Sequence, residues 1–355
     1  MSSYTTKQKD FFHKALDKVF SSHSDIKDCF RANLSRFASY KAYRLNQTLE
    51  HIKQTYSKQS DIDKVSAAAI NTFARYSQTE YNTIIKRSST AKQFSRFFDP
   101  DRLKHLPNLK WLPSVSVEPR ETHIPFYNRV WAKTDAFWQD NFPGSLWNCK
   151  CSLRETSEPI TDGNPTPTTP IAHPGLDGNP YFTKQIFSAS APYFRRPNEN
   201  QKQRQQIEKQ CELLNTKTIT HEVKQQLKDK TAQVTINNKT YKVEFHSRGI
   251  EHCLGDMLGK QDIFWLKNII LSNIDKYIKS AVCIGKKTSD TSHNTNAKTK
   301  RLKEHTDYFY YFRTTLPNGK IIYIHLGIYK KEYIDNNEMY LYSITSNLPK
   351  NTESV

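Results

Sequence analysis

The chain has 355 residues, more than one typical domain, so we expect two domains joined by a connecting segment. Its formal net charge of +18 at pH 7 favours contact with a polyanion, because Lys and Arg displace the counterions of phosphates. No apolar run reaches the roughly twenty residues of a membrane span, and we expect no cleaved leader and no membrane contact. Six scattered cysteines exclude a small disulfide-rich secreted domain and favour reduced thiols in a cytoplasm.

The first hundred residues carry a helical pattern. Apolar side chains recur at three- to five-residue steps from Ile26 to Leu49, and Asp61 opens a second run of the same kind. No proline occurs before Pro100 and no glycine before Gly144, so neither residue type interrupts a helix here. These stripes predict the core of a helical bundle.

Residues 99–159 are punctuated by proline and rich in tryptophan, which predicts irregular structure. They contain Cys149-Lys150-Cys151, and a one-residue spacer disfavours a shared zinc ion, because paired cysteines in zinc sites are usually two to four residues apart. His123 is a third candidate ligand, and no fourth can be named. A disulfide between such close neighbours is strained, and no histidine base for a nucleophilic cysteine can be assigned. We expect both thiols to pack into a core, and we predict no metal and no cofactor.

The motifs of this region resemble those of the Mu-F-like minor head proteins of tailed phages. The resemblance covers roughly residues 100–155 and consists of Arg-x-x-His at 120–123, Phe-Trp at 137–138, Pro-Gly at 143–144 and Asn-Cys-Lys-Cys at 148–151. Lys150 stands where that family usually has arginine, and Leu146 and Trp147 replace a histidine and a proline. The resemblance implies a head morphogenesis domain over residues 1–159, located in the virion, with portal and capsid proteins as partners and contact with phage DNA.

The remainder of the chain predicts a linker and a second domain. Residues 160–230 begin rich in Pro, Thr, Gly and Asn and continue as polar, helix-prone sequence, which indicates a linker with connecting helices. Residues 231–350 predict a hairpin turning at Asn237-Asn238, then helices, one of them begun by Asp262, and finally three antiparallel strands. The fold class is therefore expected to be α+β, with a mainly helical N-terminal domain and a small C-terminal domain of helices on an antiparallel sheet.

The C-terminal layout resembles the barnase, EndoU, colicin and RelE superfamily of ribonucleases in its phage-borne versions. The resemblance lies in the order of hairpin, helices and antiparallel sheet, together with His252 in Gly-Ile-Glu-His and the Tyr-Ser-Ile-Thr run at 342–345. It implies a metal-independent ribonuclease toxin, with RNA as substrate and an immunity protein as a partner.

Metal-free RNA cleavage needs a base, an acid and donors for the charge on the phosphorane, and histidine titrates in the range that suits the first two. We predict His252 and His305 as acid and base, and Arg248 as the phosphate ligand. Ordinary local packing of His252 is the alternative. We also expect polar contacts from the sheet, at His325, Ser343 and Thr345, with a solvated strand histidine and ordinary polar sheet positions as the alternatives. Phosphate contacts are expected from a basic loop, for which a solvated loop is the alternative, at Lys298, Lys300, Arg301 and Lys303.

The faces of the last strands depend on the turn near Gly319. A two-residue turn pairs Phe312 with His325, whereas a turn of different length exchanges the faces. On the last strand, alternation places Ser343 and Thr345 on one face and Tyr342 on the other.

The sequence thus favours a phage or prophage minor head protein with a C-terminal ribonuclease-like toxin domain, acting in the virion and in the cytoplasm of a bacterial host. Two alternatives stay open. One is a structural head component whose C-terminal domain binds nucleic acid or protein without cleavage. The other is a secreted effector with a head-like adaptor.

Overall fold

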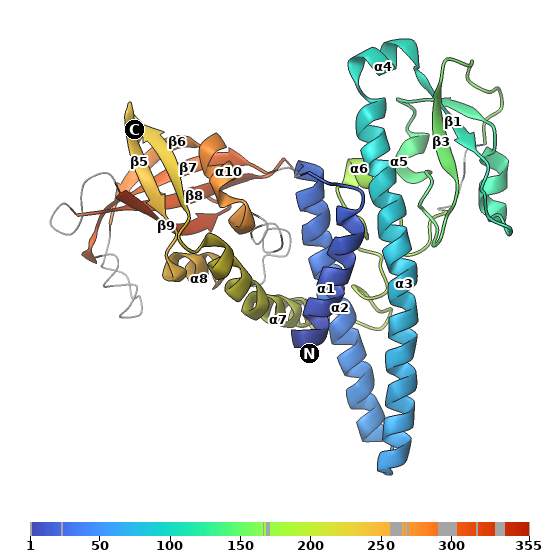
Figure 1. The fold of residues 1–355 in the computed structure, drawn as a ribbon, viewed down its shortest axis with the longest axis horizontal. Coiled ribbons are helices and arrows are strands. Elements are labelled where there is room, and N and C mark those ends of the chain that lie inside the picture. The colour runs from blue at the N-terminus through green and yellow to red at the C-terminus, as the bar shows by residue number, and fades with distance from the viewer. Residues whose placement is uncertain are drawn as a thin grey trace. The chain divides into compact units, whose positions relative to one another are not determined.

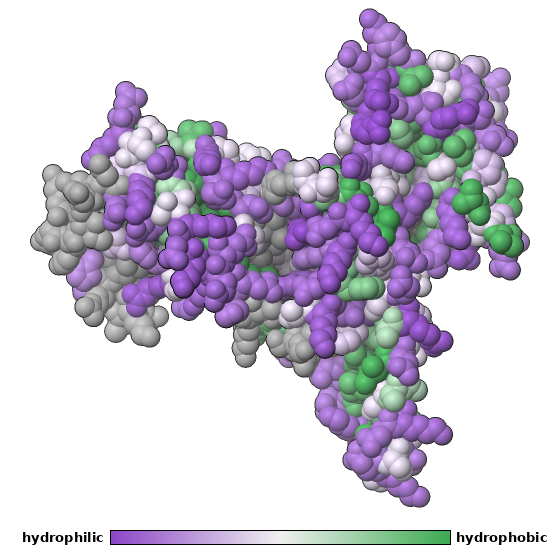
Figure 2. Space-filling view, in the orientation of Figure 1, coloured by the Kyte–Doolittle hydropathy of each residue, from purple (hydrophilic) through white to green (hydrophobic). Residues whose placement is uncertain are grey.

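The computed structural model describes residues 2–22, 24–165, 167, 171–255, 265, 267, 270–289, 304–316, 319–330 and 338–354 (Figure 1). The chain divides into two compact units, residues 1–207 and 208–355. Helices and strands are both present, and the predicted α+β class is confirmed. Within the described ranges, no helix combines the length and the apolar character that crossing a membrane requires. The face shown in Figure 2 is largely hydrophilic, as the high content of charged residues leads one to expect.

Three helices form the long part of the first unit: α1 (Ser2–Asp17), α2 (Asp25–Thr55) and α3 (Gln59–Phe97). The α2 helix begins after Ser24, whose side chain accepts a hydrogen bond from the Lys27 N–H group. Phe30 and Phe37 of the predicted stripe are fully buried. The helical N-terminal part is therefore confirmed.

A buried ion pair links α2 to α3. Lys41 Nζ lies 2.5 Å from Glu80 Oε2, and neither side chain is more than 5% exposed. Lys41 also donates a hydrogen bond to Ser77 Oγ at 2.8 Å. Because each charge compensates the other inside the core, removing either one leaves its partner buried and unpaired.

The tryptophan-rich region contains a small antiparallel sheet in addition to turns. The strand β1 (Asn108–Leu112) pairs with both β2 (Val130–Ala132) and β3 (Ser152–Thr156), and the short helices α4 (Pro100–His105), η1 (Glu121–Phe126) and α5 (Phe137–Asp140) accompany it. Buried aromatic side chains and the two free thiols of Cys149 and Cys151 form one core with Phe94 and Phe97 at the end of α3. The other aromatic members of this core are Trp111, Phe126, Trp131 and Trp138. Strands of three to five residues are too short to leave a clear alternation, so the sequence did not predict them.

Part of the segment expected to be a linker packs onto the first unit. Leu176, Ile186 and Phe187 are fully buried, and the short helix α6 (Pro180–Thr183) lies between them in sequence. Arg87 of α3 donates a hydrogen bond to the Leu176 carbonyl oxygen at 2.6 Å, and Asn33 of α2 accepts one from the Phe187 N–H group at 2.8 Å. Polar side chains of the helices thus bind backbone that carries few apolar residues of its own. The helix α7 (Gln201–Leu227) covers much of the predicted helical connection.

The second unit is built on a six-stranded sheet in the order β4-β5-β9-β8-β7-β6. Its strands are β4 (Thr231–Ile236), β5 (Lys239–Glu244), β6 (Val282–Thr288), β7 (Thr306–Thr315), β8 (Ile321–Tyr329) and β9 (Glu338–Thr345). All neighbours are antiparallel except β5 and β9, which are parallel. Asn237 and Asn238 both have positive φ, as expected for the hairpin turn. The sequence did not predict β6 or the parallel pair.

The helices α8 (Ser247–Gly255) and α10 (Ile274–Ser280) accompany the sheet. Both fall within the segments predicted to be helical. The proposed cap at Asp262 lies outside the described residues.

The register of β7 and β8 differs by one residue from that of a two-residue turn. Tyr311, and not Phe312, pairs with His325. The connection between the strands is one residue longer than expected, so the two faces exchange. Arg313 therefore lies on the same face as His325.

A β-bulge on β9 changes the predicted position of Tyr342. The pairing of β8 with β9 shifts by one residue just after the His325–Ser343 pair. Ser343 and Thr345 share a face with His325, as alternation predicts. The prediction for Tyr342 is wrong, because the extra residue of the bulge breaks the alternation, and its ring lies 4.6 Å from that of Phe309 on the His325 side.

Candidate functional site

His325 of β8 is the centre of a hydrogen-bonded cluster with two hydroxyl groups of β9, which we call the His325 cluster. Its Nδ1 atom lies 2.9 Å from Ser343 Oγ, and its Nε2 atom lies 3.0 Å from Thr345 Oγ1. The structure thus brings together all three residues that were expected to supply polar contacts in the sheet. His325 and Ser343 are only 6% and 2% exposed, so water has little access to the hydrogen bond between them.

The surroundings of Thr345 indicate the tautomer of His325. The Thr345 hydroxyl donates its one proton to the Asn347 carbonyl oxygen at 2.8 Å. It must therefore accept the hydrogen bond from the Nε2–H group of His325. In the neutral imidazole this places the one ring proton on Nε2, so that Nδ1 accepts from the Ser343 hydroxyl. An imidazole with a hydroxyl group at each ring nitrogen is suited to positioning these hydroxyl groups.

Two tyrosines flank the His325 cluster. The ring of Tyr311 meets that of His325 edge to face, with 4.6 Å between centroids and 80° between planes. Burial raises the pKa of Tyr311 to about 12, so its hydroxyl remains protonated at neutral pH. Tyr342 lies on the same side of the sheet, with its ring centroid 4.7 Å from that of His252. The proximity of these two tyrosines to histidine depends on the register of β7 and β8 and on the bulge in β9, so the sequence did not predict it.

The helix α8 presents His252 and Arg248 one turn apart, and hence on the same face. Arg248 is exposed and His252 is half-buried. The helix comes very close to β9, since a Cβ atom on Gly249 would lie 1.9 Å from the Leu341 carbonyl oxygen. This close approach, which a glycine permits, places His252 beside Tyr342.

His305 lies toward the other end of the sheet. It directly precedes Thr306, which pairs with Tyr329 at the far end of β8. Thr306 is separated from Tyr311, the partner of His325, by about 17 Å along the strand. The structure therefore does not bring His305 to the His325 cluster. The predicted substrate contacts at Lys298, Lys300, Arg301 and Lys303 lie outside the described residues.

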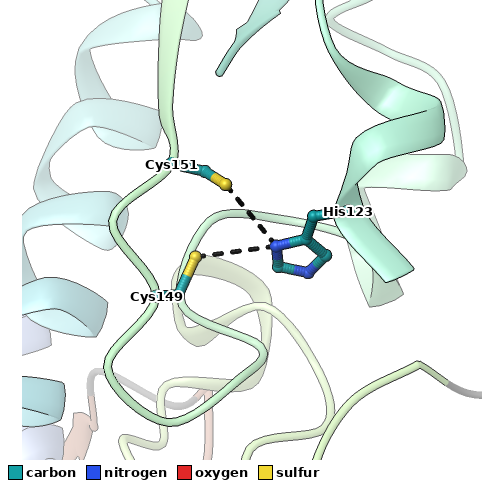
Figure 3. A group of neighbouring side chains, drawn as sticks. All are labelled: His123, Cys149 and Cys151. Carbon is teal, nitrogen blue, oxygen red and sulfur yellow. Dashed lines mark hydrogen bonds between the residues drawn. The ribbon is translucent and has the colours of Figure 1, made fainter. Parts of the chain in front are cut away.

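A second group of reactive side chains, the His123–Cys149–Cys151 cluster, lies in the first unit (Figure 3). His123 Nδ1 is 3.7 Å from Cys149 Sγ and 3.6 Å from Cys151 Sγ. The three potential ligand atoms lie within 4.8 Å of one another, and all three residues are buried. Both thiols pack in the aromatic core, as expected, but they also meet one imidazole nitrogen, which the spacing argument did not anticipate.

The two thiols of this cluster differ in acidity. A hydrogen bond from Cys151 holds the pKa of Cys149 well below that of a free thiol, and the contact with His123 acts in the same direction. The same thiol–thiol contact and burial raise the pKa of Cys151. Lys86 of α3 donates a hydrogen bond to the Cys151 carbonyl oxygen, and its ammonium group interacts electrostatically with both cysteines. One thiolate is thus stabilised here by a thiol, an imidazole and a nearby cation.

The His123–Cys149–Cys151 cluster lines a cavity of about 1210 Å³. Charged residues of both signs contribute to its wall: Lys86, Glu118, Arg120, Glu121 and Lys150, with His173 nearby on the same wall. Lys86 and His173 come from segments far from the cysteines in sequence, and no local motif pointed to either of them.

Comparisons with protein-family models, with curated proteins and with solved structures found no match for this chain.

Proposed function

We propose that the second unit cleaves RNA without a metal ion, as the resemblance to phage-borne ribonucleases implies. The observation that supports this best is the His325 cluster beside Tyr342 and His252. These residues come from α8, β8 and β9, and they include residues on which the resemblance rests. Chemical groups from three separate elements on one side of a sheet are typical of a site for catalysis or binding.

His252 is the proton acceptor in this proposal. It takes the proton of a ribose 2′-hydroxyl while the 2′-oxygen attacks phosphorus and the bond to the 5′-oxygen breaks. We assign Tyr342 as the donor that protonates the departing 5′-oxygen, so the products are a 2′,3′-cyclic phosphate and a free 5′-hydroxyl. Arg248, on the same helix face as His252, offers a guanidinium group to the phosphate oxygens.

The buried His325 acts as a positioning residue. Both of its ring nitrogens are engaged by hydroxyl groups, so its role is to hold Ser343 and Thr345 in place. His305 is not part of this assignment, because Thr306, which follows it, pairs with Tyr329 and not with a residue near His325.

The test uses the full chain and a fluorescently labelled RNA in the presence of EDTA. We expect cleavage that leaves a 2′,3′-cyclic phosphate, and a rate about 10²–10⁴-fold lower for His252→Ala. His246→Ala is the matched control, since His246 is an exposed histidine that precedes α8 by one residue, and its rate should equal that of the wild type. Intact RNA with the wild-type chain, or equal rates for His252→Ala and wild type, would reject the proposal.

We also propose that the first unit is a minor head domain that carries this module in a phage particle, near portal and capsid proteins and packaged DNA. What supports this is the motif series at residues 120–151, whose Trp and Cys side chains share one buried core. Mass spectrometry of purified particles from an induced lysogen should detect the chain. Detection only in the soluble lysate would instead favour an effector or another non-particle role.

A further inference from the structure

His123, Cys149 and Cys151 have the spacing of ligands around a tetrahedral zinc ion. With Zn–S bonds of about 2.3 Å and a Zn–N bond of about 2.05 Å, nitrogen and sulfur ligands lie about 3.6 Å apart. The two distances from His123 Nδ1 to sulfur are 3.6 Å and 3.7 Å. We infer that these three residues bind one Zn²⁺ ion through Nδ1 and the two Sγ atoms.

The hydrogen bond on the other side of the imidazole suits this role. His123 Nε2 lies 3.3 Å from Ser145 Oγ, and a proton on Nε2 donated to that oxygen leaves Nδ1 free to bind a metal. Metal-binding histidines usually have such a partner, which fixes the tautomer and the ring orientation. The ring is also held by Trp111, which it meets edge to face with 5.1 Å between centroids.

The local backbone explains how two cysteines separated by one residue can bind the same ion. Cys149 and Cys151 are buried while Lys150 between them is exposed, which is the alternation of an extended chain. Asn148 has φ +57, a left-handed conformation that ends the preceding turn. Both sulfur atoms therefore point toward His123 (Figure 3). The usual spacer of two to four residues applies to cysteines on a tight turn. On such a turn, the side chains of residues i and i+2 point in different directions.

The fourth coordination position faces the cavity. His123, Cys149 and Cys151 all line this cavity, whereas their other neighbours include the packed aromatic core. Three protein ligands with one exchangeable position are typical of catalytic zinc sites, while structural sites usually have four protein ligands. We therefore assign the fourth position to water or to a small anion drawn by Lys86.

The primary test is the metal content of the full chain, purified under reducing conditions. We expect about one zinc ion per chain, removed by a strong chelator and restored by added Zn²⁺. Cys149→Ala and Cys151→Ala should each weaken zinc binding by more than about 100-fold, since loss of an outer-shell partner alone costs about 10–100-fold. Cys29→Ala removes another buried cysteine of the same unit and should bind zinc like the wild type.

A spectroscopic measurement covers the case in which the buried variants do not fold. The wild-type chain loaded with Co²⁺ should show a thiolate-to-cobalt charge-transfer band and the visible bands of a tetrahedral site, and the visible bands should shift on adding azide. Failure of the folded wild-type chain to take up Zn²⁺, or a cobalt spectrum without thiolate bands, would overturn the metal site. A spectrum unchanged by azide would overturn the exchangeable fourth position. Because RNA cleavage is assayed in EDTA, either proposal can fail without the other.

Discussion

Replacing Ser343 with alanine tests whether the His325 cluster holds the sheet together. The change removes the hydroxyl that lies 2.9 Å from His325 Nδ1. Ser343 is 2% exposed, so water cannot easily take its place. A buried acceptor left without its partner costs about 1–3 kcal/mol. We therefore expect the second unit to lose about 1–3 kcal/mol of stability.

Hydrogen exchange followed by mass spectrometry localises this loss in the full chain. A destabilisation of about 1–3 kcal/mol should speed the exchange of protected β8 and β9 amides by about 5- to 160-fold. Peptides of β1 and β3 in the first unit serve as an internal reference. Ser346→Ala, at a partly exposed position just beyond β9, is the matched control. Wild-type exchange rates in β8 and β9 of Ser343→Ala would refute the argument that the hydroxyl supports His325.

Four further changes test other parts of the structure. Glu80→Ala should cost about 3–5 kcal/mol in urea unfolding, and adding Lys41→Met should recover most of it, because the buried charge is then gone. Gly249→Ala should lower the melting temperature of the second unit and slow RNA cleavage, since the clash with β9 backbone outweighs a helix-propensity gain of about 1 kcal/mol. Burial lowers the pKa of His13 to about 3, so the first unit should lose stability as the pH falls from about 6.5 toward 3. The loss should be at most about 1.4 kcal/mol per pH unit, and calorimetry of His13→Gln should show a flatter dependence of stability on pH. Ser145→Ala should weaken zinc binding by about 10–100-fold in a chelator competition.

The sequence predicted those features that depend on neighbouring residues. The long helices α2 and α3 follow from an apolar stripe that repeats every turn, and the hairpin of β4 and β5 follows from Asn237-Asn238, which tolerates positive φ. The shared face of Ser343 and Thr345 follows from alternation alone. In each case a few residues contain all the information that is needed.

Features that depend on register could not be predicted in the same way. One extra residue between β7 and β8 decides whether Tyr311 or Phe312 meets His325, and one extra residue on β9 decides where Tyr342 points. Such shifts of a single residue are set by packing across the whole sheet, so short motifs do not encode them. The shift on β9 also brings Tyr342 to the side of the sheet on which His252 lies.

The Cys149–Cys151 pair shows that a spacing rule is valid only for the backbone conformation from which it was derived. The side chains of two cysteines separated by one residue point apart on a turn, but on an extended segment they point to the same side. The segment directly before β3 is of the second kind, as the exposed Lys150 between two buried thiols indicates. His123 lies on a separate helix, η1, where its ring meets Trp111 of β1 edge to face and its Nδ1 atom lies close to both sulfur atoms. Two thiols that the sequence assigned to core packing thus have the geometry of a metal site, and the decisive information was the backbone conformation of residues 149–151.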